Sequence, residues 1–239
     1  MPHPPSGRSD GEPHGPAASL VRADGVSKTY RAGNAETRVL RDVRLELARG
    51  ETASLIGVSG SGKSTLLSLL AGLMLPESGE VVFDGQDIAA LDDAGRARLR
   101  AGRIGIVLQS GNLIPFLTAA ENVEMAIKLA GGQRPAARAR DLLAEVGLVD
   151  RLNHRPRRLS GGEAQRASVA MALANEPDLL LADEATGELD SGSAERVMGT
   201  ILDASRDRGL TVLYVTHNGE LAARATRRFR LVDGGVARA

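Results

Sequence analysis

Short apolar runs separated by longer helical stretches set the pattern of hydrophobic and polar positions along the chain. The apolar runs are bounded by glycine, proline or polar residues and lie at 52–56, 104–108, 179–182 and 210–215. Runs of this length are typical of strands that are buried on both faces of a parallel sheet. Between them, helices are predicted at 65–71, 92–100, 163–174 and 191–206. The pattern therefore predicts the α/β fold class.

Further strands are predicted outside this central pattern. The chain becomes ordered near Ser19, with a short strand at 19–23, and partial apolar alternation at 39–47 suggests more strands. The stretch 80–85 ends in an Asp-Gly turn. Two short strands, near 228–232 and 235–238, close the chain.

The remaining segments have a different character. Residues 1–18 are rich in Pro, Gly, Ser and charge, lack the apolar stretch of a secretory signal, and are expected to form a disordered tail. From about 117 to 159 the chain turns helical, with a break at Gly131-Gly132. We interpret this part as a helical subdomain, about 110–165, inserted into the sheet domain. The folded domain as a whole is then expected to span 19–239.

Composition narrows the possible functions. The chain has 239 residues with 30 basic and 30 acidic side chains, so it has no general electrostatic reason to bind nucleic acid or an anionic membrane. It contains no cysteine, which excludes disulfides and thiolate metal sites. No apolar run reaches the length of a membrane span, so any membrane role is expected to come through a partner.

One stretch matches a complete phosphate-binding loop. Residues 57–64 read G-x-x-x-x-G-K-S between a predicted strand and a predicted helix. Glycines allow the backbone N–H groups to point at phosphate oxygens, and the helix N-terminus adds a partial positive charge. Lys63 is expected to reach the β- and γ-phosphates, and Ser64 to hold Mg²⁺. The predicted ATP-binding residues here are Gly57, Ser59, Gly60, Ser61, Gly62, Lys63, Ser64 and Thr65.

Candidate catalytic side chains follow the other buried strands. Asp183 and Glu184 come directly after the run 179–182, where Asp183 suits Mg²⁺ and Glu184 could polarise the attacking water as a general base. Gln109 could coordinate Mg²⁺ or the water, and His217 could hydrogen-bond the γ-phosphate. Taken singly, Gln109 and His217 are more often structural than catalytic; a complete phosphate loop upstream favours the catalytic interpretation of Asp183 and Glu184.

A second candidate phosphate site lies at 159–163, which reads LSGGE. A serine and two glycines at a predicted helix start can bind phosphate. The predicted helical subdomain separates this motif from the phosphate loop, so the two are not expected to meet on one nucleotide. Upstream, Tyr30 could stack on a nucleotide base, or could simply pack against neighbouring strand residues.

The phosphate loop, Gln109, LSGGE, Asp183-Glu184 and His217 occur in an order that resembles the ATP-binding subunit of ATP-binding-cassette (ABC) transporters, over residues 19–239. The resemblance implies a P-loop NTPase (RecA-like) core with an N-terminal antiparallel β-subdomain and an inserted α-helical subdomain. It implies ATP hydrolysis with Mg²⁺ held by Ser64, Gln109 and Asp183. It also makes Tyr30 the base-stacking aromatic.

The resemblance further implies a homodimer with two ATP molecules at its interface. Each ATP lies between one chain's phosphate loop and the signature residues of the other, which are Ser160, Gly161, Gly162 and Glu163. Residues 187–190 match the loop that crosses this interface. A separately encoded multi-span permease is the expected membrane partner. The chain is then expected to be cytoplasmic and peripheral on the inner face of the membrane, with no nucleic-acid partner.

Within that family, the stretches 59–67, 117–123 and 181–191 resemble the ATPases of lipoprotein-releasing, macrolide-exporting and cell-division systems. Ala185 stands where the family usually has proline, and Asn218 where it usually has aspartate. Three functions remain open at this point: a motor for export or extraction, a regulatory ATPase of the cell-division type, and a DNA-repair or chromosome-organising ATPase. The neutral charge balance and the lack of a coiled coil count against the third.

Overall fold

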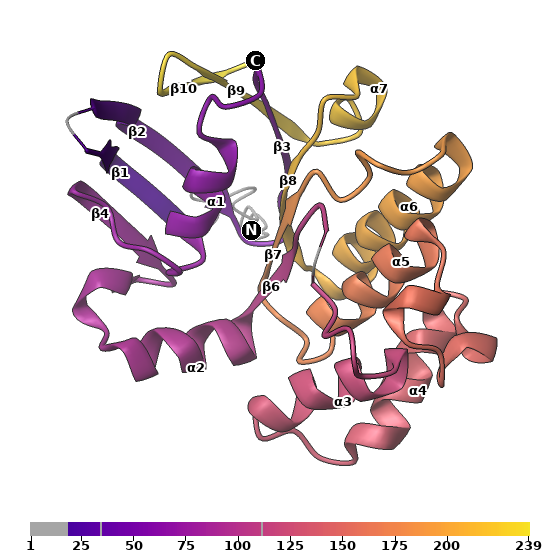
Figure 1. Ribbon diagram of the computed structural model, residues 1–239. Helices are drawn as coiled ribbons and strands as arrows, with labels where there is room; N and C mark the ends of the chain where they lie inside the picture. Colours follow the sequence, from indigo (N-terminus) through magenta and orange to yellow (C-terminus); the bar gives the residue numbers. More distant parts are fainter. Residues whose placement is uncertain (1–18, 34, 111) are drawn as a thin grey trace, which may run out of the picture.

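The computed structural model describes residues 19–33, 35–110 and 112–239. It contains an antiparallel sheet, a mostly parallel sheet, and a group of helices set to one side (Figure 1). The tail expected at 1–18 lies outside the described residues.

The antiparallel sheet is built from the N-terminal strands and has the order β2-β1-β4-β5. Its strands are β1 (Ser19–Ala32), β2 (Ala35–Ala48), β4 (Ser78–Phe83) and β5 (Gln86–Asp87). The expected strands at 19–23 and 39–47 were too short, because register shifts within the β1–β2 pair interrupt the alternation that a sequence pattern can detect. The predicted Asp-Gly turn is confirmed: Asp84 and Gly85 both have positive φ, as a tight hairpin requires.

The second sheet has the order β10-β9-β3-β8-β7-β6 and is parallel except for β10 at one edge. The buried strands β3, β7 and β8 confirm the interpretation of the apolar runs. The strands of this sheet are β3 (Thr52–Ile56), β6 (Ile104–Val107), β7 (Leu179–Asp183), β8 (Thr211–Val215), β9 (Arg227–Val232) and β10 (Gly235–Arg238).

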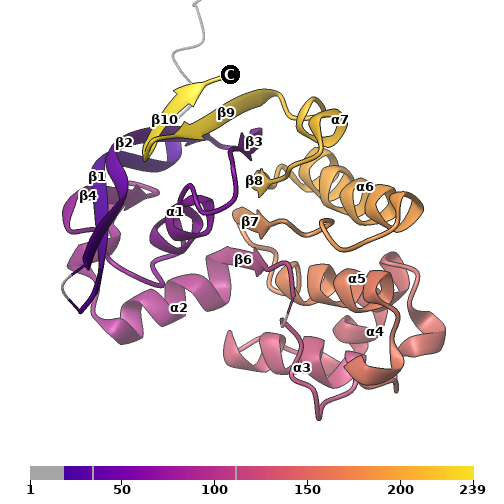
Figure 2. The same ribbon diagram turned by 45° about the horizontal axis from the view of Figure 1, so that its top comes forward.

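Helices cover both faces of the parallel sheet. The bounds are α1 (Lys63–Leu70), α2 (Asp93–Arg103), α3 (Ala119–Leu129), α4 (Pro135–Glu145), α5 (Gly161–Ala172), α6 (Ser191–Arg208) and α7 (Gly219–Ala222). One core joins α1 to the antiparallel sheet and one sheet face, and a second core joins α5 and α6 to the other face. The turned view shows α1 and α5 on opposite sides of the sheet (Figure 2).

A third core holds α3, α4 and one side of α5 together. Ala167 and Ala170 of α5 face this core, whereas Val169 and Leu173 belong to the core shared with α6. The boundary expected near 165 therefore falls inside α5, which serves both parts. Among the described residues no helix is both long enough and apolar enough to cross a membrane.

Candidate functional site

The carboxyl ends of four parallel strands meet at one edge of the sheet. In the strand register Leu55 of β3 pairs with Val215 of β8, which also pairs with Asp183 of β7. Ala182 in turn pairs with Val107 of β6. Because the strands end level with one another, the segments that follow them carry the phosphate loop, Gln109, Glu184 and His217 to the same edge, where α/β sheets bind ligands.

The phosphate loop leaves the start of α1 open to an external anion. Its N-cap is Gly62, with φ of 105°, and no side chain caps the helix, nor is any acidic residue present in the first turn. A Cβ on Gly62 would lie 2.6 Å from Val39, so only glycine fits. The Ser61 Oγ is buried without a hydrogen-bond partner among the described residues. The open N–H groups and this hydroxyl fit a phosphate group.

Lys63 is buried and is held by the loop itself. Its ammonium donates hydrogen bonds to the carbonyl oxygens of Gly57 and Val58, both at 2.9 Å, and lies 3.9 Å from the Glu184 carboxylate. The positive charge is thus already placed over the mouth of the loop. A nucleotide phosphate would exchange these neutral carbonyl partners for charged oxygens, which form stronger hydrogen bonds.

Glu184 and His217 form a direct pair. The Nε2 of His217 lies 2.5 Å from Oε1 of Glu184. Glu184 has φ of 48°, a left-handed conformation that costs a non-glycine residue energy and often occurs at functional sites. The turn after β7 thereby brings the carboxylate between Lys63 and the imidazole. A water bound there would have a base on one side and a hydrogen-bonding ring on the other.

The three expected Mg²⁺ ligands offer hard oxygen atoms. Ser64 and Gln109 are exposed, and Asp183 is half-buried at the end of β7. The Gln109 amide nitrogen donates to Glu188 at 3.1 Å, which leaves its amide oxygen available. The described residues contain no group of three His, Cys, Asp or Glu side chains that could hold a metal alone. One carboxylate supplemented by neutral oxygens and nucleotide phosphates is the donor set that suits Mg²⁺.

Tyr30 lies within β1, beyond the short strand expected at 19–23, and the residue is 43% exposed. Its hydroxyl is 3.3 Å from the Thr65 hydroxyl and 3.7 Å from the sulfur of Met74. The ring therefore stands beside the first turn of α1, where it is free to stack on a planar group.

The LSGGE segment forms a helix start of another kind. Ser160 caps α5 by accepting a hydrogen bond from the Glu163 N–H, and the Glu163 carboxylate accepts one from the Ser160 N–H. Arg151 also donates to this carboxylate, at 2.8 Å. The backbone N–H of Ser160, followed by Arg151, holds the pKa of Glu163 below its usual range. Glu163 is thus engaged within its own chain.

A scan against protein-family models matches residues 40–187 to the ABC transporter family. The chain belongs to the ABC transporter family. It is an ATP-binding, ATP-hydrolysing subunit of that family and has the cassette fold. The matched range contains the phosphate loop, Gln109, LSGGE and Glu184.

Two curated proteins resemble the chain over nearly their full length. A lipoprotein-releasing system ATP-binding protein LolD from Geobacter metallireducens is 47% identical over 221 residues, covering 92% of this chain and 98% of that protein. LolD 1 from Caulobacter vibrioides is 45% identical over 219 residues, covering 90% and 94%.

Two solved structures of the ATP-binding cassette MJ0796 are also similar. One is a dimeric post-hydrolysis state bound to ADP and Pi, and the other is described as the dimeric structure of a bacterial ABC transporter cassette. Each has a TM-score of 0.86 and 39% identity, and each comparison covers 92% of this chain and 97% of that chain.

Two polar residues near the candidate ATP site, Gln165 and Asn112, were not assigned a role from the sequence. Gln165 is buried on α5 and donates to the Leu108 carbonyl at 2.9 Å. Asn112 accepts from the Leu108 N–H at 2.7 Å. The sequence gives no signal for the Gln165 bond, because its partner is 57 residues away in the chain.

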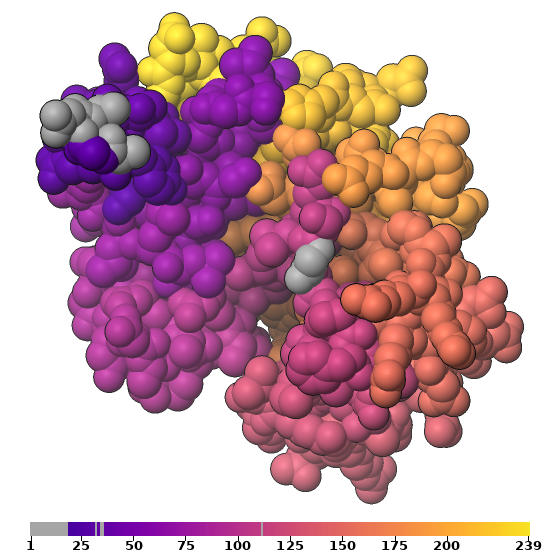
Figure 3. Space-filling view, viewed as in Figure 1, coloured from indigo at the N-terminus to yellow at the C-terminus, as the bar shows by residue number. Residues whose placement is uncertain are grey.

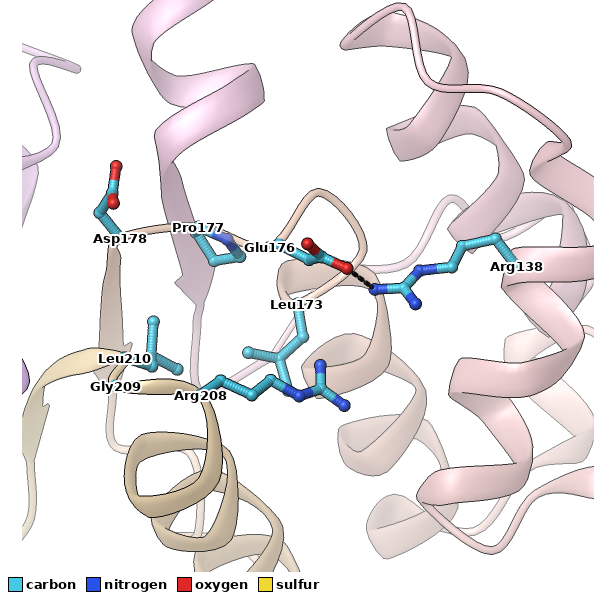
Figure 4. A pocket seen from close by; sticks show the side chains of 8 residues that line it. All are labelled: Arg138, Leu173, Glu176, Pro177, Asp178, Arg208, Gly209 and Leu210. Atoms are coloured by element: carbon cyan, nitrogen blue, oxygen red, sulfur yellow. Dashed lines mark hydrogen bonds and ion pairs between the residues drawn. The ribbon is translucent and has the colours of Figure 1, made fainter.

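A cavity of about 460 Å³ lies away from the nucleotide elements (Figure 4). Asp178 and Leu210 on its wall immediately precede β7 and β8, so it sits at the amino ends of the strands. Its arginines are already paired, Arg138 with Glu176 at 2.7 Å and Arg208 with Glu145 at 2.5 Å. The cavity is therefore distinct from the ATP site, and its arginines have no free charge to offer a phosphate.

Proposed function

We propose that this ABC ATPase powers the extraction of lipid-modified proteins from a membrane through a separate permease. The observation that carries the proposal is the 47% identity to a lipoprotein-releasing ATP-binding protein over 98% of that protein's length. A second relative with the same printed role is 45% identical. Both relatives favour a motor for export or extraction over a regulatory ATPase of the cell-division type.

In the proposed reaction, water attacks the γ-phosphate of ATP to give ADP and phosphate. The loop N–H groups and Lys63 bind the phosphates, and Tyr30 stacks on the base. Glu184 takes the proton from the attacking water, while His217 orients that carboxylate and the phosphate. Mg²⁺ bound by Ser64, Asp183 and Gln109 would neutralise charge on the phosphate oxygens.

The proposed working unit is a two-fold dimer in which each ATP lies between two chains. The start of α1 and the start of α5 lie on opposite faces of the sheet, which supports their use on different nucleotides. In a two-fold dimer each chain then offers its phosphate loop to one ATP and its Ser160, Gly161, Gly162 and Glu163 to the other. The dimeric MJ0796 cassettes support this assembly.

A groove between α2, β6 and α3 is the proposed docking surface for the permease. Its volume is about 310 Å³, and a hollow between α2 and α3 is visible in the space-filling view (Figure 3). Met125 and Leu129 on its rim are 39% and 73% exposed. The strand β6 in its floor leads directly to Gln109, so a permease segment seated there lies close to the ATP site.

The proposed function is tested by isolating the full-length protein with its membrane partner and placing the complex in lipid vesicles. A lipid-modified protein in the vesicles should be released only with Mg-ATP, and the Glu184→Gln complex is the inactive control. ATP hydrolysis without any release of the lipid-modified protein would refute the proposed cargo.

The docking groove is tested by purifying variants with the membrane partner. Loss of the partner in Met125→Glu and Leu129→Glu, but not in Leu73→Glu, would support the groove as the docking surface; Leu73 is 53% exposed and lies outside the groove.

A further inference from the structure

Elements that serve different ATP molecules in the proposed dimer meet around one small cavity. The cavity has a volume of about 230 Å³, and its wall includes Gln109, Gly161, Gln165 and Glu188. Gln109 belongs to the chain's own ATP site, whereas Gly161 belongs to the signature offered to the partner's ATP. Residues assigned to both sites therefore line one cavity of a single chain.

Hydrogen bonds beside this cavity hold the segment that leads from β6 to Gln109. The buried amide of Gln165 donates to the Leu108 carbonyl at 2.9 Å. The N–H of Leu108 donates to Asn112, whose own amide donates to the Ile106 carbonyl at 3.0 Å. The backbone of Leu108, the residue before Gln109, is thus held twice: its carbonyl by Gln165 of α5, and its N–H by Asn112, which is itself bonded to β6.

Gln165 lies four residues after Gly161, one turn along the same helix. A rigid helix transmits a displacement of one turn to the next, so Gln165 and LSGGE move together. Leu108 is covalently bound to Gln109, which responds to the nucleotide. The Gln165 hydrogen bond therefore links a sensor of one ATP to the helix start that contacts the other.

We propose that Gln165 is a positioning residue that couples the two ATP sites of the dimer. When ATP and Mg²⁺ engage Gln109, the backbone of Leu108 moves with it and α5 follows through Gln165. The chain then presents LSGGE to the partner's ATP in a different position. This inference rests on the proposed shared site, because a signature serving its own chain would leave nothing to couple.

The amide group of Gln165 points to a role beyond packing, because a side chain that only filled the space there would not need an amide. Burial of an amide is favourable only if its hydrogen bonds are made, and the amide of Gln165 makes its bond to a different element of the fold. Ser168 is also buried on α5 and also on the cavity wall, and its hydroxyl donates to the Ala164 carbonyl of its own helix; among the described residues it has no other partner. Ser168 is therefore the matched control for packing at this cavity.

The experiment compares Gln165→Met and Gln165→Glu with Ser168→Ala. Met keeps the length without a donor, and a carboxylate keeps the shape but cannot donate to the carbonyl. We expect the unmutated dimer to hydrolyse ATP with a Hill coefficient above 1. Both Gln165 variants should bring it to about 1 and lower kcat about tenfold, the scale of a typical coupling between sites. ATP affinity measured at dilution, without hydrolysis, should stay within about twofold, because the phosphate loop is untouched.

Several results would overturn the proposal. A Hill coefficient of 1 in the unmutated protein would show that no coupling exists. Unchanged cooperativity in the Gln165 variants, or an equal loss in Ser168→Ala, would remove the specific role of the bond. If both Gln165 variants melt far below the unmutated protein, the bond holds the fold instead of coupling the sites.

Failure of the inference can be distinguished from failure of the shared site. Mixing chains that carry Lys63→Ala with chains that carry Ser160→Arg restores activity only if the site is shared, whether or not Gln165 couples the sites. Restored activity together with unchanged cooperativity in Gln165→Met would refute the inference alone.

Discussion

Two helix starts in this chain are candidates for binding phosphate, and they are built in opposite ways. The start of α1 has a left-handed glycine as its N-cap, no capping side chain and no acidic residue in the first turn. The start of α5 has a complete capping box, in which Ser160 and Glu163 satisfy each other's N–H groups. The first is open to an anion, whereas the second already carries a carboxylate of its own.

Because of this difference, only the start of α1 is expected to bind ATP without a second chain. Unsatisfied N–H groups and the buried Lys63 give α1 a strong anion site within one chain. At α5 the negative charge of Glu163 opposes a second anion, so LSGGE is expected to contribute only when another chain already holds the nucleotide. The start of α3 has the same capping box, formed by Thr118 and Glu121, and shows that this motif serves helix stability in general.

The largest expected effect comes from Glu184→Gln, which leaves both helix starts intact and removes the proposed base. Turnover should fall by about 10²–10⁴, the usual contribution of general base catalysis. ATP should remain bound and hold two chains together. Phosphate release and size-exclusion chromatography with Mg-ATP measure the two effects, and near-normal turnover would exclude Glu184 from its role.

Lys63→Ala removes the positive charge at the open start of α1. Loss of a charged hydrogen-bond donor to phosphate costs about 1.5–3 kcal/mol, which corresponds to a weakening of ATP binding by roughly ten- to a hundredfold. Calorimetric titration measures it. Lys128→Ala is the control, since Lys128 pairs with Glu124 on the surface of α3. An unchanged ATP affinity would contradict the assignment of the phosphate loop.

Mixing Lys63→Ala chains with Ser160→Arg chains tests whether the two helix starts serve one ATP from different chains. Each mutant alone should be nearly inactive. Random mixing makes half of the dimers mixed, and each of these has one intact site, so recovery of about a quarter of the unmutated activity is expected. Heterodimer formation is verified by tagging one chain. Verified heterodimers, if still inactive, would favour a signature that serves its own chain or a dimer that needs both sites.

The smallest effect is expected for Glu163→Gln, which keeps the capping geometry and removes the opposing charge. Its amide oxygen can still accept from the Ser160 N–H, so the half-saturating ATP concentration for hydrolysis should fall by about twofold, as exposed helix-terminus charges allow. A marked rise in that concentration would show that the carboxylate itself is needed.

The same variant makes a prediction about pH. The folded pKa of Glu163 lies below its unfolded value, so its stabilisation is present above the unfolded pKa and is lost as pH falls through the folded pKa. Below about pH 4, near the unperturbed glutamate pKa, the melting temperatures of the two proteins should converge. A constant difference across the acid range would show that the charge of Glu163 does not stabilise the fold.

Features of the site and of the fold whose residues are close together in the chain could be predicted from the sequence. The phosphate loop at 57–64, the turn at Asp84-Gly85 and the end of α6 at Gly209, with φ of 65°, each follow from local backbone requirements. The buried strands β3, β7 and β8 follow from uninterrupted apolar runs, because a strand covered on both faces has no polar alternation. The residues after these strands could then be assigned to one edge of a parallel sheet.

Contacts between distant segments depended on the tertiary structure. His217 meets Glu184 across 33 residues only because β7 and β8 pair in a register that ends both strands level. The strand β1 contains polar residues that alone would not predict a strand. Its full length comes from its pairing with β2 and β4. Gln165 carries no signal for its bond to Leu108, since a glutamine pattern on a helix is the same whether its amide faces water or a carbonyl. Local geometry is encoded residue by residue, whereas such contacts arise only when the register of the sheet and the packing of α5 are both set.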